Sequence, residues 1–367
     1  MIAADDARHM ARALLLAERW RGQTSPNPMV GAVVVDAEGV VVGRGAHEAA
    51  GGPHAEVHAL DAAGERARGG TLYCTLEPCS HVGRTAPCAP RVVDAGIRRA
   101  VVATEDPNPK VSGRGLAYLR DHGVEVDVGT LATEARRLNR PFFTFVRRAR
   151  PFVTMKAALS LDGCVAARRG ERTALTGYAA NHAIHEERAE IDAIAVGSET
   201  VLVDDPLLTA RGTHRSRPLT RVVFDRRLRT PSTARLMATL DEGPVIIFST
   251  TASLRRDPAR AAALELAGAT LEAIEPGDDR FLRSTLARLA QLEVVSLVVE
   301  GGPTLHDAFW RAGLVDRVEL FVSPRAVGPE GVDWIPLADG TIAGLHELSA
   351  KPVGDDVLIE GYVHRPR

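Results

Sequence analysis

The stretch HAEVHAL (residues 54–60) opens a helical pattern, and EPCSHVGRTAPC (residues 77–88) follows an apolar run typical of a buried strand. Together they decide how the first half of the chain is interpreted. They offer one imidazole, from His54, and two thiols, from Cys79 and Cys88. These groups are common zinc ligands, and three protein ligands leave the fourth tetrahedral position open, as in catalytic zinc sites. We therefore predict a catalytic zinc site held by these three side chains.

Glu56 lies two residues after His54 and is the candidate acid and base of this site. Zinc lowers the pKa of its water toward about 7, and a nearby carboxylate can carry protons to a leaving amine. The order H-x-E, then P-C and a further cysteine, is that of the zinc deaminases. Two alternatives stay open: HAEVH alone also fits a solvated helix start, and a structural zinc site would need a fourth protein ligand. We expect His58 to pack or face solvent, and Cys74 to be a small buried strand residue.

Composition limits the classes of function that the 367 residues can serve. Hydrophobic content of 45% and charged content of 25% are typical of a globular protein, and the length fits two domains. The net charge of −2 and the 4% of aromatic residues argue against a nucleic-acid partner, such as a polynucleotide deaminase would need. The apolar runs are too short to span a membrane, and the acidic start lacks the blocks of a signal peptide. Four cysteines make no disulfide framework, so we expect a cytoplasmic protein.

Alternating strand and helix patterns predict an α/β fold throughout the chain. A probable hairpin at residues 29–45 precedes further helix and strand patterns, which predict a layered domain with a largely parallel sheet. The segment NRPFFTFVRRARPF (residues 139–152) is basic, punctuated by prolines and poorly periodic. It places a boundary that divides the chain into domains 1–146 and 147–367, the second with its own α/β series.

Four motifs of the first half occur together in a known family: TSPNPMVGAVV (24–34), PHAEVHAL (53–60), TLEPCSHVGRTAPC (75–88) and DPNPKVSGRG (106–115). With them the sequence resembles the deaminase half of the bifunctional riboflavin-biosynthesis deaminase-reductases. The resemblance implies a cytidine-deaminase-like α/β/α fold. It also implies zinc-dependent deamination of a small phosphorylated substrate, 2,5-diamino-6-(5-phosphoribosylamino)pyrimidin-4-one.

Three residues outside the zinc site are candidates for contact with that substrate. Asn27 lies in the first motif, although an asparagine flanked by prolines is also an ordinary turn residue. His81 and Arg84 lie between the two cysteines and could meet the substrate phosphate, since arginine suits bidentate contact. A surface arginine in a loop is an equally good interpretation.

The second half resembles the reductase half of the same family in RPFVTMKAALSLDG (150–163), DAIAVGSETVLVDDPLLTAR (192–211) and VVEGGPTL (298–305). The resemblance implies a dihydrofolate-reductase-like α/β fold, NADPH as cofactor, reduction of the ribosyl to the ribityl side chain, and a homo-oligomer, either dimer or tetramer. The strand, glycine turn and helix of the last motif would expose backbone N–H groups that suit a phosphate. On its own, the same pattern is also a plain β–α turn.

Residue roles in the second half come from the resemblance alone. Cofactor contacts are implied for Leu159, Ala174, Thr200, Asp204, Gly301, Gly302, Pro303, Thr304 and Leu305. Substrate contacts are implied for Lys156, Arg172, Arg188, Leu208, Arg211 and Glu300. Two arginines at a phosphorylated sugar make electrostatic sense. Lys156 could instead assist proton transfer or be a solvated strand residue, and Asp162 is expected to hold the loop that ends the first strand.

One departure from the family lies in GERTALTG (residues 170–177), where a serine and a tryptophan are expected and Arg172 and Ala174 stand. The lost aromatic side chain removes contact area from the cofactor, whereas the arginine could supply a phosphate contact. The alternative to a bifunctional enzyme is therefore an active deaminase whose C-terminal domain binds nucleotide but no longer reduces this substrate.

Overall fold

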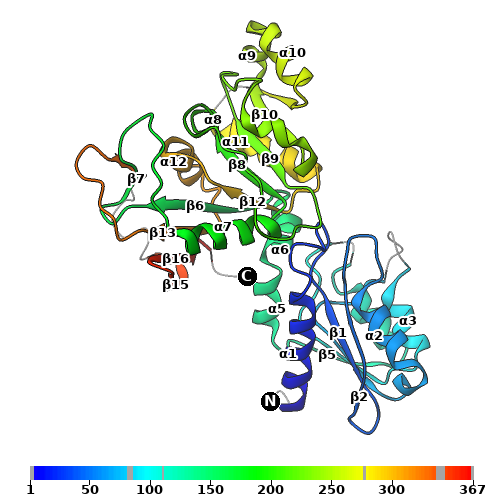
Figure 1. Cartoon of the computed structure of the whole chain (residues 1–367). Helices are drawn as coiled ribbons and strands as arrows, with labels where there is room; N and C mark the ends of the chain where they lie inside the picture. Colours follow the sequence, from blue (N-terminus) through cyan, green and yellow to red (C-terminus); the bar gives the residue numbers. More distant parts are fainter. Residues whose placement is uncertain (1–3, 81–85, 110, 276–277, 336–343, 365–367) are drawn as a thin grey trace. The chain divides into compact units, whose positions relative to one another are not determined.

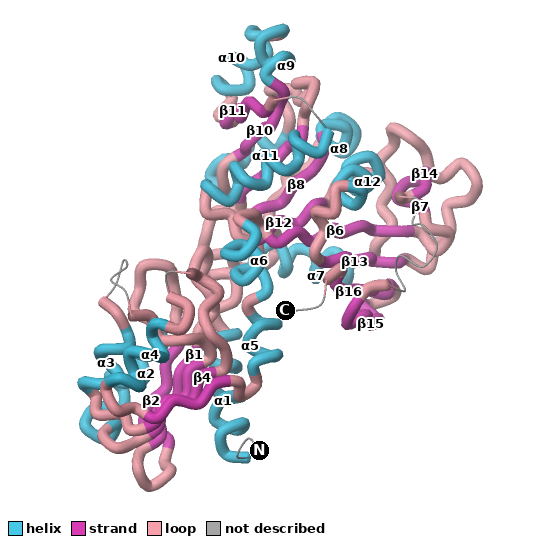
Figure 2. The backbone as a smooth tube through the Cα atoms, turned by 180° about the vertical axis from the view of Figure 1, so that it is seen from behind, coloured by secondary structure: helices cyan, strands magenta, loops and turns pink. Residues whose placement is uncertain are grey.

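The computed structural model describes residues 4–80, 86–109, 111–275, 278–335 and 344–364 (Figure 1 and Figure 2). Its internal contacts divide the chain into two compact units, of which the first ends at Ala149 and the second begins at Arg150. Each unit is an α/β structure with its own sheet and core. Within the described residues, no helix is both long and apolar enough to cross a membrane.

The sheet of the first unit has the strand order β2-β1-β3-β4-β5. Its strands are β1 (Gly31–Val35), β2 (Val41–Ala46), β3 (Thr71–Cys74), β4 (Arg99–Val102) and β5 (Glu125–Val128). The predicted hairpin is confirmed as β1 and β2, which are antiparallel. The sheet is mixed rather than largely parallel: β3, β4 and β5 are parallel, but β1 lies antiparallel to both of its neighbours. The hairpin turn places β2 antiparallel beside β1. The chain then crosses β1 and enters β3 on its other side in the same direction as β2, so β1 is antiparallel to both neighbours.

Helices cover both faces of this sheet, because a strand places alternate side chains on opposite sides. The helices are α1 (Ala4–Glu18), α2 (Ala55–Ala63), α3 (Cys88–Asp94), α4 (Arg114–Asp121) and α5 (Ala132–Leu138). In β1, Ala32 and Val34 pack with residues of α2, α3 and α4, whereas Val33 and Val35 pack with residues of α1 and α5. Figure 1 shows α1 and α5 on one side of the sheet and α2 and α3 on the other. The unit is therefore a three-layer α/β/α structure.

The first helix packs on β1 at very short range. A Cβ atom on Gly31 would lie 1.9 Å from the carbonyl oxygen of Ala13, which is far inside van der Waals contact. Only glycine allows the helix backbone to approach the strand this closely. The close approach fixes α1, a helix that the sequence patterns above did not include.

The segment expected to be a poorly periodic boundary is a helix, α6 (Arg140–Arg148). Its proline lies in the first turn, where a missing backbone N–H costs no hydrogen bond. Ala149 ends the helix with a φ of 50°. The predicted division at residues 146 and 147 thus falls within α6, and the assignment of one activity to each side of it stays a prediction.

Among the described residues of the second unit, a nine-stranded sheet has the order β11-β10-β9-β8-β12-β6-β13-β16-β15. Its strands are β6 (Phe152–Leu159), β8 (Ala193–Gly197), β9 (Thr220–Phe224), β10 (Val245–Thr250), β11 (Thr270–Ile274), β12 (Ser296–Val299), β13 (Arg317–Val322), β15 (His346–Val353) and β16 (Asp356–Tyr362). All pairs from β11 to β13 are parallel, and β16 and β15 close the sheet as an antiparallel hairpin. The carboxyl ends of the parallel strands therefore meet at one edge, where ligands commonly bind in α/β sheets.

Helices on both faces bury this second sheet. They are α7 (Tyr178–Glu190), α8 (Ser198–Asp204), α9 (Thr251–Arg256), α10 (Pro258–Leu266), α11 (Asp278–Gln291) and α12 (Pro303–Arg311), with a 3₁₀ segment η2 (Arg235–Glu242). In β8, Ala193 and Ala195 belong to the core under α11 and α12, whereas Ile194 and Val196 belong to the core under η2 and α10. A small separate hairpin pairs β7 (Cys164–Ala166) with β14 (Val332–Asp333). Figure 2 shows it beyond the end of β6.

Candidate zinc centre and cofactor cavity

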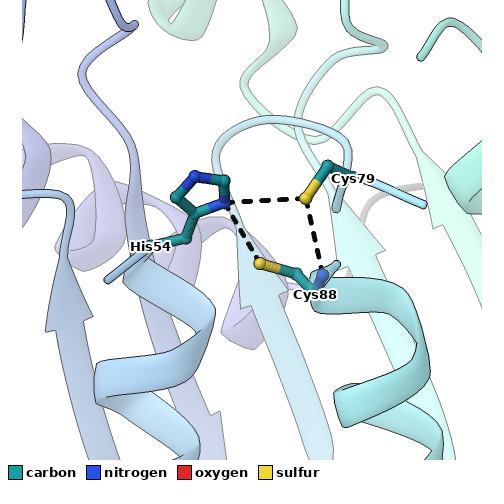
Figure 3. Close-up of side chains that lie close together, drawn as sticks. All are labelled: His54, Cys79 and Cys88. Carbon is teal, nitrogen blue, oxygen red and sulfur yellow. Dashed lines mark hydrogen bonds between the residues drawn. The ribbon is translucent and has the colours of Figure 1, made fainter. Parts of the chain in front are cut away.

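The three predicted zinc ligands converge in the first unit (Figure 3). Nδ1 of His54 lies 3.2 Å from Sγ of Cys88 and 3.6 Å from Sγ of Cys79. All three candidate ligand atoms lie within 4.8 Å of one another. Zinc–sulfur and zinc–nitrogen bonds of about 2.3 and 2.0 Å at a tetrahedral angle separate the two ligand atoms by about 3.6 Å. The spacing and the chemistry of the donors therefore fit a zinc ion.

Each ligand is positioned by the end of a secondary-structure element. His54 directly precedes α2, Cys88 is the first residue of α3, and Cys79 lies in the loop that follows β3. The backbone N–H of Cys88 points at Sγ of Cys79, 3.4 Å away, and the N–H of Ala89 donates to the Cys79 carbonyl oxygen. The start of α3 thus binds the loop and holds both sulfurs on the same side.

Hydrogen bonds among the candidate ligands favour the thiolate form of Cys79. The thiol of Cys88 lowers the pKa of Cys79, against the opposing effect of burial, and His54 lowers it further, to about 4. The same contact with Cys79, together with burial, raises the pKa of Cys88. The hydrogen bond to Cys79 also raises the pKa of His54. The pair of thiols therefore shares one proton, which a bound zinc ion would displace.

Glu56 lies in the first turn of α2 and is 3% exposed. Burial raises its pKa to about 7, partly offset by the charge of His54. A carboxyl group that titrates near neutral pH is well matched to acid and base catalysis. His58 is half-buried, and Cys74 is fully buried with a raised pKa, as expected.

Asn27 lies near this centre and is held by a histidine that the sequence did not single out. Nδ2 of Asn27 donates to Nε2 of His47 over 3.0 Å, while Nδ1 of His47 donates to the carbonyl oxygen of Pro53 over 3.1 Å. The His47 ring also lies edge-on to the ring of His54, with centroids 5.4 Å apart. No local spacing could have indicated His47, because its partners come from separate segments. His81 and Arg84 lie outside the described residues.

The motif DPNPKVSGRG (106–115) wraps around the carboxylate of Glu77, two residues before Cys79. This carboxylate accepts backbone N–H groups of Asp106 at 3.2 Å, Gly113 at 2.9 Å and Gly115 at 2.9 Å. A buried carboxylate with several N–H donors is a rigid anchor. Glu77 therefore joins residues of this motif to the start of the cysteine loop.

A cavity of about 1310 Å³ opens in the second unit at the carboxyl ends of β6, β8, β9, β10 and β12. Small-ligand pockets commonly have about 300–1,000 Å³, so this one has room for a dinucleotide and a second ligand. It is lined by the predicted residues Lys156, Arg172, Thr200, Asp204, Glu300, Gly301, Gly302, Pro303, Thr304 and Leu305. The predicted residues that are not among its lining are Leu159, Ala174, Arg188, Leu208 and Arg211. Leu159 and Leu208 are buried, whereas Ala174 and Arg211 are exposed.

Glu300 ties two predicted substrate residues together. Nε and Nη2 of Arg188 donate to its two carboxylate oxygens at 3.0 and 2.7 Å, and Nζ of Lys156 lies 3.6 Å from the same carboxylate. Burial raises the pKa of Glu300, but the charges of Arg188 and Lys156 outweigh it and hold the value at about 2. Arg211 contacts His185 of α7, the helix that also carries Arg188. Arg188 and Lys156 therefore meet at Glu300, directly after β12, and Arg211 lies beside the same helix α7.

The segment that departs from the family borders the cavity through Arg172. Burial raises the pKa of Asp204 in α8, and the charge of Arg172 lowers it, which places the guanidinium close to that carboxyl group. Arg172 thus adds positive charge beside a predicted cofactor residue. Asp162 accepts from the hydroxyl of Ser160 in the loop that ends β6, as expected, and it also accepts from the backbone N–H groups of Val327 and Gly328.

The glycine turn after β12 leads directly into α12, whose first residues border the cavity. A Cβ atom on Gly302 would meet no atom within 4 Å, so the turn is open on the cavity side. A helix start that faces an open turn offers N–H groups and a favourable dipole to a phosphate. Seven arginines that line the same cavity were not singled out from the sequence: Arg168, Arg169, Arg226, Arg227, Arg229, Arg256 and Arg311.

Comparisons with known proteins agree with both sites. Residues 3–104 match the cytidine and deoxycytidylate deaminase zinc-binding region, and residues 151–359 match the RibD C-terminal domain. The riboflavin biosynthesis protein RibD of Aquifex aeolicus is 41% identical over 98% of this chain and 99% of its own. That of Escherichia coli is 37% identical over 96% and 98%.

Solved structures resemble the whole chain as well. Acinetobacter baumannii RibD is 34% identical, with a TM-score of 0.86 over 98% of this chain and 99% of its own. The Thermotoga maritima diaminohydroxyphosphoribosylaminopyrimidine deaminase/5-amino-6-(5-phosphoribosylamino)uracil reductase is 34% identical, with a TM-score of 0.84 over 98% of both chains. These matches confirm a cytidine-deaminase domain followed by a reductase domain of the dihydrofolate-reductase-like fold. The chain therefore belongs to the RibD family of bifunctional deaminase-reductases of riboflavin biosynthesis.

Proposed function

We propose that the first unit deaminates 2,5-diamino-6-(5-phosphoribosylamino)pyrimidin-4-one and that the second reduces the ribosyl side chain of the product to ribityl. The observation that carries this proposal is the convergence of His54, Cys79 and Cys88, with the buried carboxyl group of Glu56 on the same helix start. Three ligands and one acid that titrates near neutrality are the parts that hydrolytic deamination requires.

Family membership brings zinc for the deamination and NADPH for the reduction. When bound, zinc activates a water molecule and NADPH supplies a hydride. In the first unit, the carboxylate of Glu56 would take a proton from the attacking water, and the carboxylic acid formed would give a proton to the leaving nitrogen. We assign the contact with the pyrimidine to the amide of Asn27, and its hydrogen bond to His47 supports this assignment.

In the second unit, the backbone of Gly301–Leu305 is placed to hold the cofactor pyrophosphate, as the open turn at Gly302 supports. The ribosyl phosphate meets the cationic side chains Arg188, Arg211 and Lys156, with Glu300 fixing two of them in place. These groups bind and orient, and the cofactor carries the chemistry.

The enzyme is further inferred to act in the cytoplasm as a homodimer or homotetramer on a free small molecule. The described cysteines are all thiols, in keeping with a reducing compartment. Size-exclusion chromatography with light scattering tests the assembly, and a monomer at micromolar concentration would contradict it.

A product mass spectrum tests the two reactions together. Zinc-loaded protein is incubated with NADPH and the diaminopyrimidine substrate. The expected product has exchanged one amine for oxygen and gained two hydrogens. The Glu56→Gln variant serves as the control, because it should form neither product. A product that has lost its amine but gained no hydrogen would contradict the proposed reductase role.

A further inference from the structure

The cavity of the second unit is strongly cationic at the carboxyl ends of β9 and β10. Arg226, Arg227 and Arg229 follow β9, and Arg256 is the last residue of α9, which follows β10. The residues that line this end are Phe224, Arg226, Arg227, Arg229, Thr250, Ala252, Ser253 and Arg256. Glu199, which also lines the cavity, pairs with Arg229 at 2.8 Å, but the four arginines outnumber this carboxylate, so this end of the cavity favours an anion.

Two of these arginines are brought together by one serine. Oγ of Ser253 donates to the carbonyl oxygen of Arg226 at 2.8 Å, and Nη2 of Arg256 lies 3.4 Å from the same Oγ. Both arginines are exposed, and Nη1 of Arg229 donates to Glu199 at 2.8 Å. Arg226 also lies over the ring of Phe281, 5.8 Å from its centroid. Ser253 therefore joins the backbone of Arg226 to the guanidinium group of Arg256, and both arginine side chains line the cavity.

The acid at the end of β9 is turned away from the cavity. Oδ2 of Asp225 accepts both the backbone N–H and the hydroxyl of Thr230 at 2.7 Å, and the residue is fully buried. Sites for non-phosphorylated dinucleotides commonly use a strand-end acid to bind the ribose 2′-hydroxyl, whereas an arginine there accommodates a 2′-phosphate. Here the acid is occupied, and the next residue is Arg226.

The position of this cationic end matches the adenosine half of a dinucleotide. In the strand order, β9 is separated from β12 by β8 alone, so the two strands lie about 10 Å apart. A ribose that links two phosphates, together with the reach of an arginine side chain, spans such a distance. The opposite direction from β12 leads to β6 and to Lys156, a predicted substrate residue.

We propose that Arg226 and Arg256 bind the 2′-phosphate of NADPH and thereby set the preference for NADPH over NADH. This inference rests on the proposed function, since it assumes that the pyrophosphate lies at Gly301–Leu305. It names the group that distinguishes the two cofactors, which the sequence motifs alone did not reveal.

Binding of the two cofactors to the zinc-loaded full-length protein, without substrate, tests the inference. Dissociation constants for NADPH and NADH are measured by titration calorimetry for the wild type and for Arg226→Gln, Arg256→Gln and the double variant. Each charge-assisted hydrogen bond contributes about 1.5–3 kcal/mol. Each single variant should therefore weaken NADPH binding about 10-fold or more, while NADH binding changes less than about 2-fold. The matched control is Arg255→Gln, an exposed neighbour that does not line the cavity and should change neither value.

Two other results would overturn the inference in distinguishable ways. Equal losses of NADPH and NADH would mean that the arginines contact the shared part of the dinucleotide. If wild-type protein bound neither cofactor, the proposed function of this unit would itself fail. A Gly302→Glu variant shows the pattern expected for loss of a shared contact, because a blocked phosphate turn should weaken the binding of both cofactors to the same extent.

Discussion

A buried hydrogen bond between His306 and Trp334 should be a principal support of the cavity wall. His306 is fully buried in α12; its Nδ1 accepts from Nε1 of Trp334 at 2.8 Å, and its Nε2 donates to the carbonyl oxygen of Val299 at 3.0 Å. Burial lowers the pKa of His306 to about 4, so the ring is neutral at pH 7 and both contacts are used. The bond fixes the segment of β14 to the helix that follows the glycine turn.

Replacing His306 with phenylalanine keeps a flat ring but leaves the Trp334 N–H and the Val299 carbonyl without this partner. Each unsatisfied buried group costs about 1–3 kcal/mol, so the free energy of unfolding of the second unit should fall by about 2–6 kcal/mol. A unit of this size loses about 2–4 °C of melting temperature per kcal/mol, which predicts a drop of at least about 4 °C.

Calorimetry of the full chain measures this drop, and a double-mutant cycle identifies its origin. Trp334→Phe removes the donor and leaves Nδ1 of His306 unpaired, whereas the double variant removes both groups. The two single losses should therefore exceed the loss in the double variant by about 1–3 kcal/mol. Strictly additive losses, or a shift below about 1 °C in His306→Phe, would refute this reasoning.

Three further changes have definite expected outcomes. Glu56→Gln should keep full zinc content by atomic absorption while ammonia release falls about 10²–10⁴-fold; loss of zinc would contradict its role as a proton carrier. The pKa of Glu300 is held at about 2, so its stabilising effect is complete above about pH 4.5 and is lost as the pH falls toward 2. Urea unfolding of Glu300→Gln should therefore depend less on pH in that range than the wild type does. Gly115→Ala should weaken zinc binding in a chelator competition, since its Cβ would lie 1.9 Å from the Pro78 carbonyl oxygen, next to Cys79; unchanged affinity would show that the loop adapts freely.

The zinc centre could be predicted because its candidate ligands and Glu56 come from two short segments of the sequence. His54 and Glu56 lie at one helix start, and Cys79 and Cys88 bracket one loop, so each pair keeps its spacing whatever the rest of the fold does. The mixed sheet could not be derived in the same way. Strand patterns give the face that a strand buries, but the direction of β1 relative to β3 depends on the path of the connection between them.

Long-range hydrogen bonds could not be predicted either, because they also depend on the path of the chain between distant segments. The contact of Asn27 with His47 joins residues from separate loops, and that of His306 with Trp334 joins a helix to the residue that follows β14. Helix α1 is a different case: Met10, Ala13 and Ala17 are buried at helical spacing, so a signal existed in the sequence. Alanine is only weakly hydrophobic, so the buried face of α1 differs little from its exposed face in the sequence, and the helix is easily missed.

Glu56 and Glu300 show how the surroundings of one side-chain type can move its pKa in opposite directions. Burial raises the pKa of both, but only Glu300 has two cations close enough to reverse the effect, so the values are about 7 and about 2. Glu56 can therefore exchange a proton near neutral pH, whereas Glu300 stays charged. The proton that opening of the ribose ring consumes then cannot come from Glu300. Of the two cations that hold it, Arg188 keeps its protons in proteins, and an ammonium group can give one up. Lys156, 3.6 Å from the carboxylate, is accordingly the better candidate for the proton donor, and Glu300 for the charge that orients it.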